Sequence, residues 1–234
     1  MKSIEHLLKS GLSYRIEDEI IVVKETQSLQ ADNKKFSKFY NIIANIYDLG
    51  SRLYFGFFGG EKKARGEFLE HLNVNPHDNV LEISVGTGIN IQLLPTEANY
   101  YGLDISHEML RKCRRNLQKS QRNALLFQAE AENLPFRDGV FGCVFHVGGM
   151  NYFANKKRAI DEMIRVAKSG SYITIVDETD KFFTTFSWIP LLNNFFKTGD
   201  ATQPPTHLLP KNIKNMSLTT VVNGNYWRLS FQKM

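Results

Sequence analysis

Cysteine is scarce in this sequence, since only Cys113 and Cys143 occur among 234 residues. Two cysteines cannot build a disulfide framework or a four-cysteine zinc site, and their scarcity is typical of a reducing compartment. Residues 1–6 also lack the apolar core of a signal peptide. We therefore expect a cytoplasmic protein that holds no metal.

Long uncharged stretches are missing as well. The longest, at 139–155, contains four glycines and is too short to cross a bilayer, which argues against stable membrane insertion. The excess of positive charge is slight, because 29 Lys and Arg residues face 24 Asp and Glu residues, giving a net charge of +5. With 42% hydrophobic residues, the composition predicts one globular domain and excludes disordered, collagen-like and coiled-coil chains.

Strand-like and helix-like segments alternate from about residue 60 to residue 180, a pattern typical of a mostly parallel α/β sheet. Short apolar runs predict five strands that are covered on both faces; they lie at 79–84, 100–104, 124–128, 140–147 and 171–177. One helix is expected after Ser106 and another is expected to end at Ser169–Gly170. The alternation predicts a doubly wound α/β fold with helices on both faces of the sheet.

The two ends of the chain show other patterns. Alternating runs at 216–222 and 226–232, joined by Asn223–Gly224–Asn225, predict an antiparallel C-terminal hairpin. Residues 1–35 are expected to form an N-terminal extension with a small hairpin, and residues 36–234 to form the main domain.

The segment most informative about chemistry is a predicted buried strand that runs into Gly86–Thr87–Gly88 and then into a helix. Glycine lets backbone approach a ligand closely, and a helix N-terminus presents free N–H groups. Ile91 stands where a dinucleotide-binding fingerprint has its third glycine, which argues against NAD or FAD. The next strand ends at Asp104, 18 residues after Gly86, where a carboxylate can accept hydrogen bonds from ribose hydroxyls. Alone, Asp104 could equally be a helix cap; beside the glycine turn, the ligand role is favoured.

Four blocks in this order resemble the class I S-adenosylmethionine-dependent methyltransferases. They are residues 81–88 (LEISVGTG), 102–106 (GLDIS), 129–136 (AEAENLPF) and 165–170 (RVAKSG). The third block is similar to that of methyltransferases of the ubiquinone and menaquinone biosynthesis type. Ile46–Tyr47–Asp48 looks like the Tyr-Asp element of the same group.

The resemblance implies a Rossmann-like domain that uses S-adenosylmethionine and releases S-adenosylhomocysteine. The positions it implies for cofactor binding are Glu82, Ser84, Gly86, Thr87, Gly88, Asp104, Ile105, Met109, Glu130, Ala131, His146 and Val147. Among these, Glu82 would organise the turn or the amino group, Asp104 would hold the ribose, and Glu130 would accept from the adenine amino group. The role of Glu132 stays open.

Two positions depart from the family pattern. The family usually has glycine at the position of Ser84, and the fourth block usually reads Leu-Lys-Pro-Gly-Gly instead of Ala167–Ser171. A serine side chain at this point could weaken the cofactor affinity or could donate a hydrogen bond. A protein that binds the cofactor as a sensor, without turnover, is therefore an alternative.

Methyl transfer from a sulfonium needs mainly positioning of two reactants and exclusion of water. If the acceptor is a carbon or a phenol, a base is also needed. The candidates for this base are His146, Tyr47 and Asp177; the alternatives are a core role for His146 and a capping role for Asp177.

Aromatic residues gather in two segments, 36–60 and 181–200, on either side of the predicted sheet. The resemblance implies that both segments cover the acceptor site, which favours a small, apolar or aromatic acceptor. The alternatives are two amphipathic helices that pack on the sheet, or interfacial membrane contact around Trp188.

Six basic residues fall within twelve positions after Asp104: Arg111, Lys112, Arg114, Arg115, Lys119 and Arg122. Such a run could follow RNA phosphates, so an RNA methyltransferase is a second alternative. A solvated outer helix explains the same run, and we favour that interpretation, with no nucleic acid partner. The pattern leaves the oligomeric state open.

Overall fold

The computed structural model describes residues 4–24, 48–185 and 202–234. In chain order, its elements are β1 (Tyr14–Glu17), β2 (Ile20–Val23), α2 (Glu61–Leu69), β3 (Asn79–Ile83), α3 (Ile89–Leu93), β4 (Asn99–Asp104), α4 (His107–Lys119), β5 (Leu125–Gln128), β6 (Phe141–Val147), η2 (Met150–Tyr152), α5 (Lys156–Val166), β7 (Ala167–Glu178), α6 (Asp180–Thr185), η4 (Thr206–Leu208), β8 (Ile213–Val221) and β9 (Tyr226–Lys233). Residues 48–56 are also helical. Each of the five predicted central strands is present.

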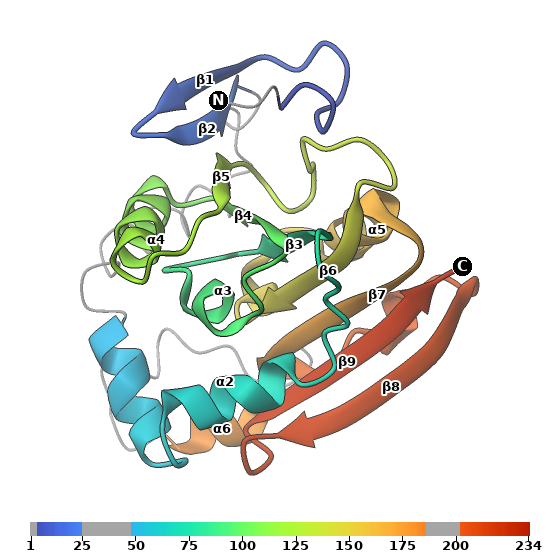
Figure 1. The fold of residues 1–234 in the computed structure, drawn as a ribbon. Coiled ribbons are helices and arrows are strands. Elements are labelled where there is room, and N and C mark those ends of the chain that lie inside the picture. Colours follow the sequence, from blue (N-terminus) through green and yellow to red (C-terminus); the bar gives the residue numbers. More distant parts are fainter. Residues whose placement is uncertain (1–3, 25–47, 186–201) are drawn as a thin grey trace.

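The described strands form one sheet in the order β1-β2-β5-β4-β3-β6-β7-β9-β8 (Figure 1). Strands β5, β4, β3, β6 and β7 are parallel, whereas β9 is antiparallel to both β7 and β8. Among these central strands, the chain begins with β3, continues outward through β4 and β5, and then returns to the other side of β3 as β6. The expected doubly wound, mostly parallel α/β fold with an antiparallel C-terminal hairpin is confirmed. In such sheets, ligands generally bind where the strand order reverses, which here is beside β3.

Alternating residues of the central strands feed two cores, one on each face of the sheet. Leu81 and Ile83 of β3 pack in the core that contains α5, while Val80 packs in the core that contains α4. Helix α4 begins at its N-cap Ser106, whose hydroxyl accepts from Met109 N, as the sequence predicts. Its buried residues recur every three or four positions, so one stripe faces the sheet and the charged remainder faces solvent.

The predicted end of the second helix is wrong. Helix α5 ends at Val166, and strand β7 already begins at Ala167, so Ser169–Gly170 lie within the strand. The N–H groups of Gly139 and Val140 donate to the carbonyls of Arg165 and Val166, which draws the chain into sheet pairing at that point. A register shift between β6 and β7 accommodates the extra residues near Gly170.

The N-terminal residues join the main sheet. Strands β1 and β2 form the expected small antiparallel hairpin, and β2 pairs in parallel with β5, so the hairpin extends the sheet at one edge (Figure 1). Before the hairpin, Leu8 forms an isolated bridge with Phe136, and Ile4 and Leu7 are buried in the core on the α5 side. The extension therefore shares its core with the methyltransferase-like blocks.

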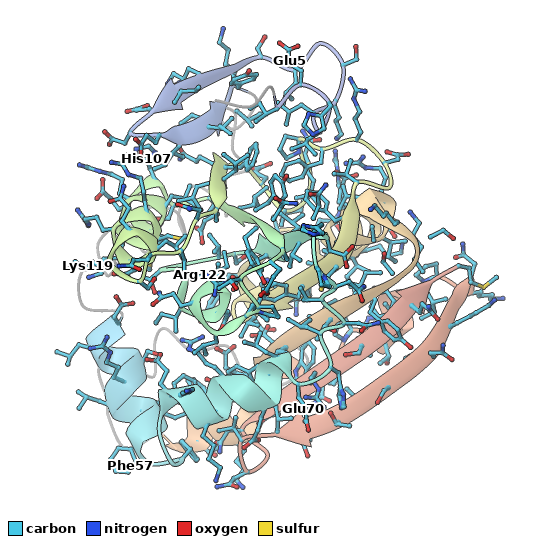
Figure 2. The ribbon with its side chains drawn as sticks, viewed as in Figure 1. Glu5, Phe57, Glu70, His107, Lys119 and Arg122 are labelled. Carbon is cyan, nitrogen blue, oxygen red and sulfur yellow. The ribbon has the colours of Figure 1, made fainter. Side chains whose placement is uncertain are left out.

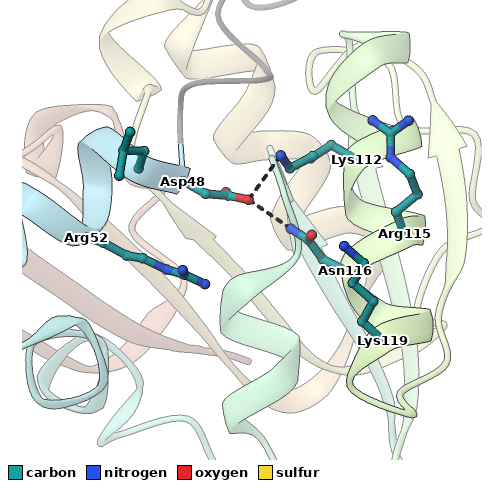
Figure 3. Close-up of a pocket in the computed structure, with 7 residues that line it drawn as sticks. Asp48, Arg52, Lys112, Arg115, Asn116 and Lys119 are labelled. Atoms are coloured by element: carbon teal, nitrogen blue, oxygen red, sulfur yellow. Dashed lines mark hydrogen bonds and ion pairs between the residues drawn. The ribbon is translucent and has the colours of Figure 1, made fainter.

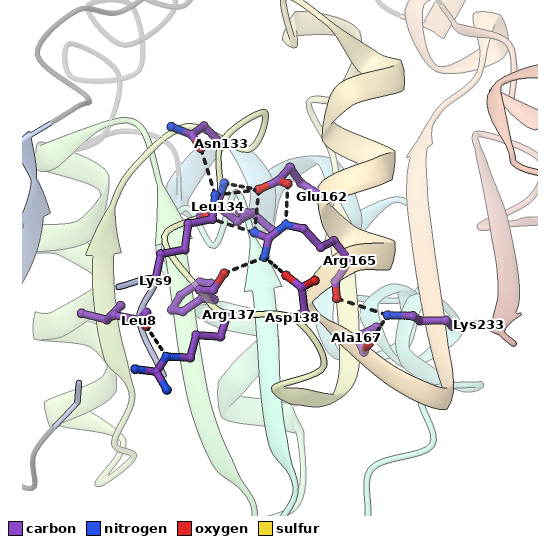
Figure 4. A network of polar contacts seen from close by, with 11 residues as sticks. Leu8, Lys9, Asn133, Leu134, Arg137, Asp138, Glu162, Arg165, Ala167 and Lys233 are labelled. Atoms are coloured by element: carbon purple, nitrogen blue, oxygen red, sulfur yellow. Dashed lines mark hydrogen bonds and ion pairs between the residues drawn. The ribbon is translucent and has the colours of Figure 1, made fainter. Parts of the chain in front are cut away.

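Arg165 of α5 fixes the loop that contains Leu134 and Phe136 (Figure 4). Its guanidinium donates to Phe136 O at 2.8 Å and to Leu134 O at 3.2 Å. It also pairs with Glu162 at 2.6 Å and Asp138 at 2.7 Å, and both carboxylates have a lowered pKa because of this guanidinium. The network links the third and fourth sequence blocks, so part of their similarity to the family has a structural basis.

Candidate cofactor site

The strand register brings the predicted ligand residues to one edge of the sheet. Ile83 of β3 lies opposite Leu103 of β4 on one side and opposite His146 of β6 on the other. Because parallel strands end at the same edge, the glycine turn after β3, Asp104 and His146 converge there.

Asp104 contacts the glycine turn directly. Its Oδ2 accepts from the backbone N–H of Gly86 at 2.9 Å, and its Oδ1 accepts from Ser106 N at 2.9 Å. The side chain is buried, and burial raises the pKa of Asp104 to about 6, although the backbone hydrogen bonds lower it. The N–H of Ile105 is a third backbone partner, and a carboxylate has about four acceptor positions, so a hydroxyl donor can still be accepted.

The turn has an unusual backbone. Ser84, Gly86 and Gly88 all have positive φ, at 55°, 54° and 76°. Such values suit glycine and strain a residue with a Cβ, which explains in physical terms why the family usually has glycine at the position of Ser84. At Gly88, an added Cβ would lie 2.6 Å from Cys113 Sγ of α4, so this position is also restricted by close packing.

Glu82 lies under the turn as a buried carboxylate. Its Oε1 accepts from Asn90 Nδ2 at 2.6 Å, and Asn90 Oδ1 in turn accepts from Arg65 Nη1 at 2.8 Å. Its Oε2 is buried and finds no hydrogen-bond donor among the described residues. Burial raises the pKa of Glu82 to about 8, against the lowering effects of Asn90 and Arg65. A cationic donor would satisfy this oxygen and stabilise the charged form.

Sequence reasoning missed three polar residues that support this turn. Asn90 and Arg65 complete the chain of hydrogen bonds to Glu82, and Asn116 of α4 donates to Thr87 O at 3.0 Å. Asn90 lies in the first turn of α3, and a polar residue in this otherwise apolar helix is a sequence feature that indicates a role at the site. No sequence feature indicates such a role for Arg65 or Asn116, because only tertiary packing brings them to the glycine turn.

The remaining predicted cofactor positions lie around the ends of β4 and β5. Ile105 is half-buried, and its carbonyl accepts from Gln128 Nε2 at 3.1 Å. Met109 is buried in the first turn of α4. In the loop after β5, Glu130 is half-buried and Ala131 is buried. The neighbouring Glu132 is also buried, and its carboxylate accepts a hydrogen bond from the backbone N–H of Asn155 at 3.3 Å. The last contact gives Glu132 a structural role.

His146 is fully buried at the end of β6, next to the half-buried Val147. Its Nδ1 lies 3.1 Å from Ile83 O, and a carbonyl can only accept, so Nδ1 carries the proton. Burial lowers the pKa of His146 and keeps the ring neutral. Its Nε2 therefore presents a lone pair, and this atom has no hydrogen-bond partner among the described residues.

Asp177 lies near the end of the adjacent strand β7, two residues beyond Ile175, the partner of His146 in the register. Its Oδ1 accepts from Gly149 N at 3.0 Å and from Glu178 N at 3.1 Å, so the carboxylate fixes the loop after β6. The structure thus gives Asp177 a structural role in fixing this loop, which differs from the cap of the following segment that the alternative expected. Burial and the proximity of Asp177 raise the pKa of Glu178 well above its usual range. Tyr47, the third candidate base, lies outside the described residues.

Part of each aromatic segment packs together beside the ends of β6 and β7. Tyr54 has its ring centroid 5.0 Å from that of Phe58 and 5.0 Å from that of Phe182, and it also contacts Tyr226. Val147 and Val176 border this cluster. Tyr54, Phe55, Phe58 and Phe182 thus pack as a core, as the alternative interpretation expects, whereas Phe57 is 87% exposed. Trp188 lies outside the described residues.

Most of the basic run on α4 and just after it is paired within the chain. Arg111 pairs with Asp18 at 3.1 Å, Arg114 with Glu19 at 3.1 Å, and Lys112 with Asp48 at 3.7 Å. Arg122 donates to Leu94 O at 2.7 Å. Four of the six residues therefore have partners, which weakens the case for a continuous RNA-binding stripe.

The residues at this edge fit S-adenosylmethionine. The cofactor has a cationic amino group, a ribose diol and an adenine amino group, and the site offers a buried carboxylate oxygen without a donor at Glu82 and a second buried carboxylate at Asp104.

No group of three or more His, Cys, Asp and Glu residues that could hold a metal ion occurs within 4–24, 48–185 and 202–234. In the same parts of the chain, none of the helices has both the length and the apolar character needed to cross a membrane.

Comparison with known proteins gives a consistent result. The methyltransferase domain family matches residues 81–175. The chain is 30% identical to a demethylmenaquinone methyltransferase of Thermotoga maritima, over 71% of this chain and 76% of that protein. It is 24% identical to the ubiquinone/menaquinone biosynthesis C-methyltransferase of Wigglesworthia glossinidia brevipalpis, over 99% of this chain and 82% of that protein.

A solved structure from Thermotoga maritima, described as a S-adenosylmethionine-dependent methyltransferase and possible histamine N-methyltransferase, has the same fold. Its TM-score is 0.62 with 17% identity, over 83% of this chain and 99% of that one. The fold, the ordered blocks and the relatives agree on S-adenosylmethionine as the cofactor. The chain belongs to the class I S-adenosylmethionine-dependent methyltransferases and is similar to those of the ubiquinone/menaquinone type.

Proposed function

We propose that this methyltransferase transfers a methyl group, in line, to a ring carbon of a small hydroxylated aromatic compound of the quinol class. The names of two relatives support this acceptor class, since one is a C-methyltransferase of quinone biosynthesis and the other acts on demethylmenaquinone. Tyr54 is buried in the aromatic cluster beside the strand ends, but Phe58 and Phe182, which pack against it, are only partly buried and leave an apolar surface for such a ring.

On the cofactor side, Glu82 accepts from the amino group, Asp104 accepts from the ribose hydroxyls, and Glu130 accepts from the adenine amino group. Gly86–Thr87–Gly88 keep the backbone close to the ligand, and Ile105, Met109 and Ala131 line the adenine. When bound, S-adenosylmethionine supplies a methyl group that its sulfonium charge already activates. The chain's residues hold the two reactants in line and exclude water.

The observation that carries the acceptor class is the unpartnered Nε2 of His146. A new carbon–carbon bond forms at the ring while the sulfur–carbon bond breaks, so the ring system must give up one proton. A phenolic hydroxyl is a donor that Nε2 can accept from, and its ionisation makes the neighbouring ring carbon a nucleophile. The neutral, fixed tautomer of His146 suits this role, because the hydrogen bond to Ile83 O keeps the proton on Nδ1.

The test compares wild type with His146→Asn, using radiolabelled methyl transfer to a reduced demethylated naphthoquinone. The Asn amide can replace Nδ1–H toward Ile83 O but offers no nitrogen at the position of Nε2. We expect kcat to fall by a factor of about 10² to 10⁴, the usual contribution of a general base. Any loss of S-adenosylhomocysteine affinity should be much smaller than the loss of kcat, although His146 is also among the positions expected to line the cofactor, and His146→Gln serves as the second variant.

Two results would contradict the proposal. One is equal kcat for wild type and His146→Asn with a properly folded variant. The other is transfer of label to oxygen or nitrogen acceptors, or to bulk RNA, with no transfer to a quinol carbon.

A further inference from the structure

A row of large apolar side chains is exposed along the helical residues 48–56 and the turn that follows. Leu49 is 62% exposed, Leu53 64% and Phe57 87%. Their spacing of four residues places them on one face of a helix. Exposed leucines in a continuous row cost free energy in water, so such a row is typical of a surface that contacts an apolar phase.

A cationic cavity of about 570 Å³ adjoins this row, between the helical residues and α4 (Figure 3). Its lining residues are Asp48, Leu49, Arg52, Lys112, Arg115, Asn116 and Lys119. Asp48 neutralises Lys112. Arg115 and Lys119 are exposed and have no ion pair with a described residue, and Arg52, 75% exposed, lies 4.0 Å from the nearest carboxylate, that of Glu61.

Leu49 belongs to both features, so the apolar row and the cationic cavity form one surface. Figure 2 shows Phe57 and Lys119 on the same side of the molecule. Beyond Phe57, the stem of Lys63 lies against Gly59 and adds a further cation near this end of the row. We call Leu49, Arg52, Leu53, Phe57, Arg115 and Lys119 the docking surface.

We propose that the docking surface binds the face of an anionic phospholipid bilayer. The cations would contact headgroup phosphates, and the apolar row would enter the boundary between headgroups and acyl chains. A free phosphate would use the cations alone and leave the apolar row unexplained. RNA would be expected to stack on exposed rings, whereas two of the three apolar residues are leucines. This inference goes beyond the proposed function and holds whatever the methyl acceptor is.

The test is flotation of the full chain with vesicles of phosphatidylcholine containing 30% phosphatidylglycerol, and with vesicles of phosphatidylcholine alone. We expect binding to the anionic vesicles only, and a strong decrease when the salt concentration is raised. Arg115→Gln/Lys119→Gln should lower the partition coefficient by about twentyfold or more, at about fivefold for each charge. Leu53→Ser/Phe57→Ser should lower it by at least about tenfold.

Matched controls change the same residue types elsewhere on the surface. Lys168→Gln/Arg158→Gln removes two exposed cations, and Met216→Ser/Leu218→Ser removes two exposed apolar side chains of β8. Both pairs should bind vesicles like wild type, and thermal melts should show that all variants are folded.

The proposal is overturned if wild type binds neutral and anionic vesicles equally, binds neither, or if the control pairs lose binding as much as the docking-surface pairs. It is also overturned if millimolar inorganic phosphate at constant ionic strength abolishes vesicle binding, because the cavity then takes a free anion. Salt-sensitive binding of bulk RNA without binding to anionic vesicles would assign the cations to a nucleic acid.

Discussion

Ser84 has a strained backbone conformation, with a φ of +55°. This conformation is unfavourable in free energy for any residue that has a Cβ. Replacement by glycine removes this strain and should raise the free energy of unfolding by about 1 kcal/mol. Cofactor affinity should be retained or should increase. Chemical denaturation and calorimetry with S-adenosylhomocysteine measure the two effects. A less stable Ser84→Gly variant would show that the serine hydroxyl makes a compensating interaction.

Glu82 gives the protein a stability that depends on pH. Its pKa is raised by burial to about 8, so folding favours the protonated form, and the stabilisation present at low pH is lost as pH rises through 8. Glu82→Gln stays neutral and removes this dependence. Between pH 6 and pH 8, wild type should lose about 2 kcal/mol of unfolding free energy relative to the variant.

Urea denaturation of both proteins at the two pH values checks this expectation, and the difference between the proteins cancels the other titrating groups. If both proteins lose the same unfolding free energy between pH 6 and pH 8, Glu82 is charged or solvated in the folded protein. The same variant should bind S-adenosylhomocysteine more weakly at pH 8, because a neutral amide replaces the carboxylate that faces the amino group.

At the scale of elements, the junction between the glycine turn and α4 depends on close packing. Gly88→Ala adds a Cβ at 2.6 Å from Cys113 Sγ, in a residue with φ of +76°. We expect a loss of about 2 to 3 kcal/mol of unfolding free energy. Adding Cys113→Ala removes the steric part, so the double variant should be more stable than expected from the two single changes. Additive losses in a double-mutant cycle would contradict the packing explanation.

The sequence predicts the positions of strands that are buried on both faces, such as β3 and β6, because each of them appears as a simple apolar run. The proximity of Asp104 and Gly86 could also be predicted, since Asp104 ends β4 and Gly86 lies in the turn that follows the adjacent parallel strand β3. The end of α5 did not follow, because Ser169–Gly170 is a good local stop signal, and only pairing with residues 139–140 overrides it. Arg65 was unpredictable, because its contact with Asn90 depends on how α2 packs.

On the scale of the whole molecule, residues 4–24 complete both the sheet and one core. They contribute the buried Ile4, Leu7 and Leu8, and strand β2 covers the edge of β5. Removal of residues 1–24 should lower the unfolding free energy by at least about 3 kcal/mol and expose an aggregation-prone edge. Thermal melts and light scattering measure both effects.

The control for this truncation is Arg15→Gln/Glu17→Gln, which removes an exposed ion pair of β1 without touching the core. Its stability should stay within about 0.5 kcal/mol of wild type. A truncated protein as stable and soluble as wild type would mean that the hairpin is dispensable for the methyltransferase fold.

The central claim is that Asp104 and the glycine turn together bind S-adenosylmethionine. Calorimetric titration of wild type and Asp104→Ala with S-adenosylhomocysteine tests it most directly, with the exposed Asp161→Ala as the control. We predict that Asp104→Ala weakens binding by about 1.5 to 3 kcal/mol, roughly 10- to 150-fold, while the control binds like wild type. Equal affinity of Asp104→Ala and wild type, with both proteins folded, would contradict the claim.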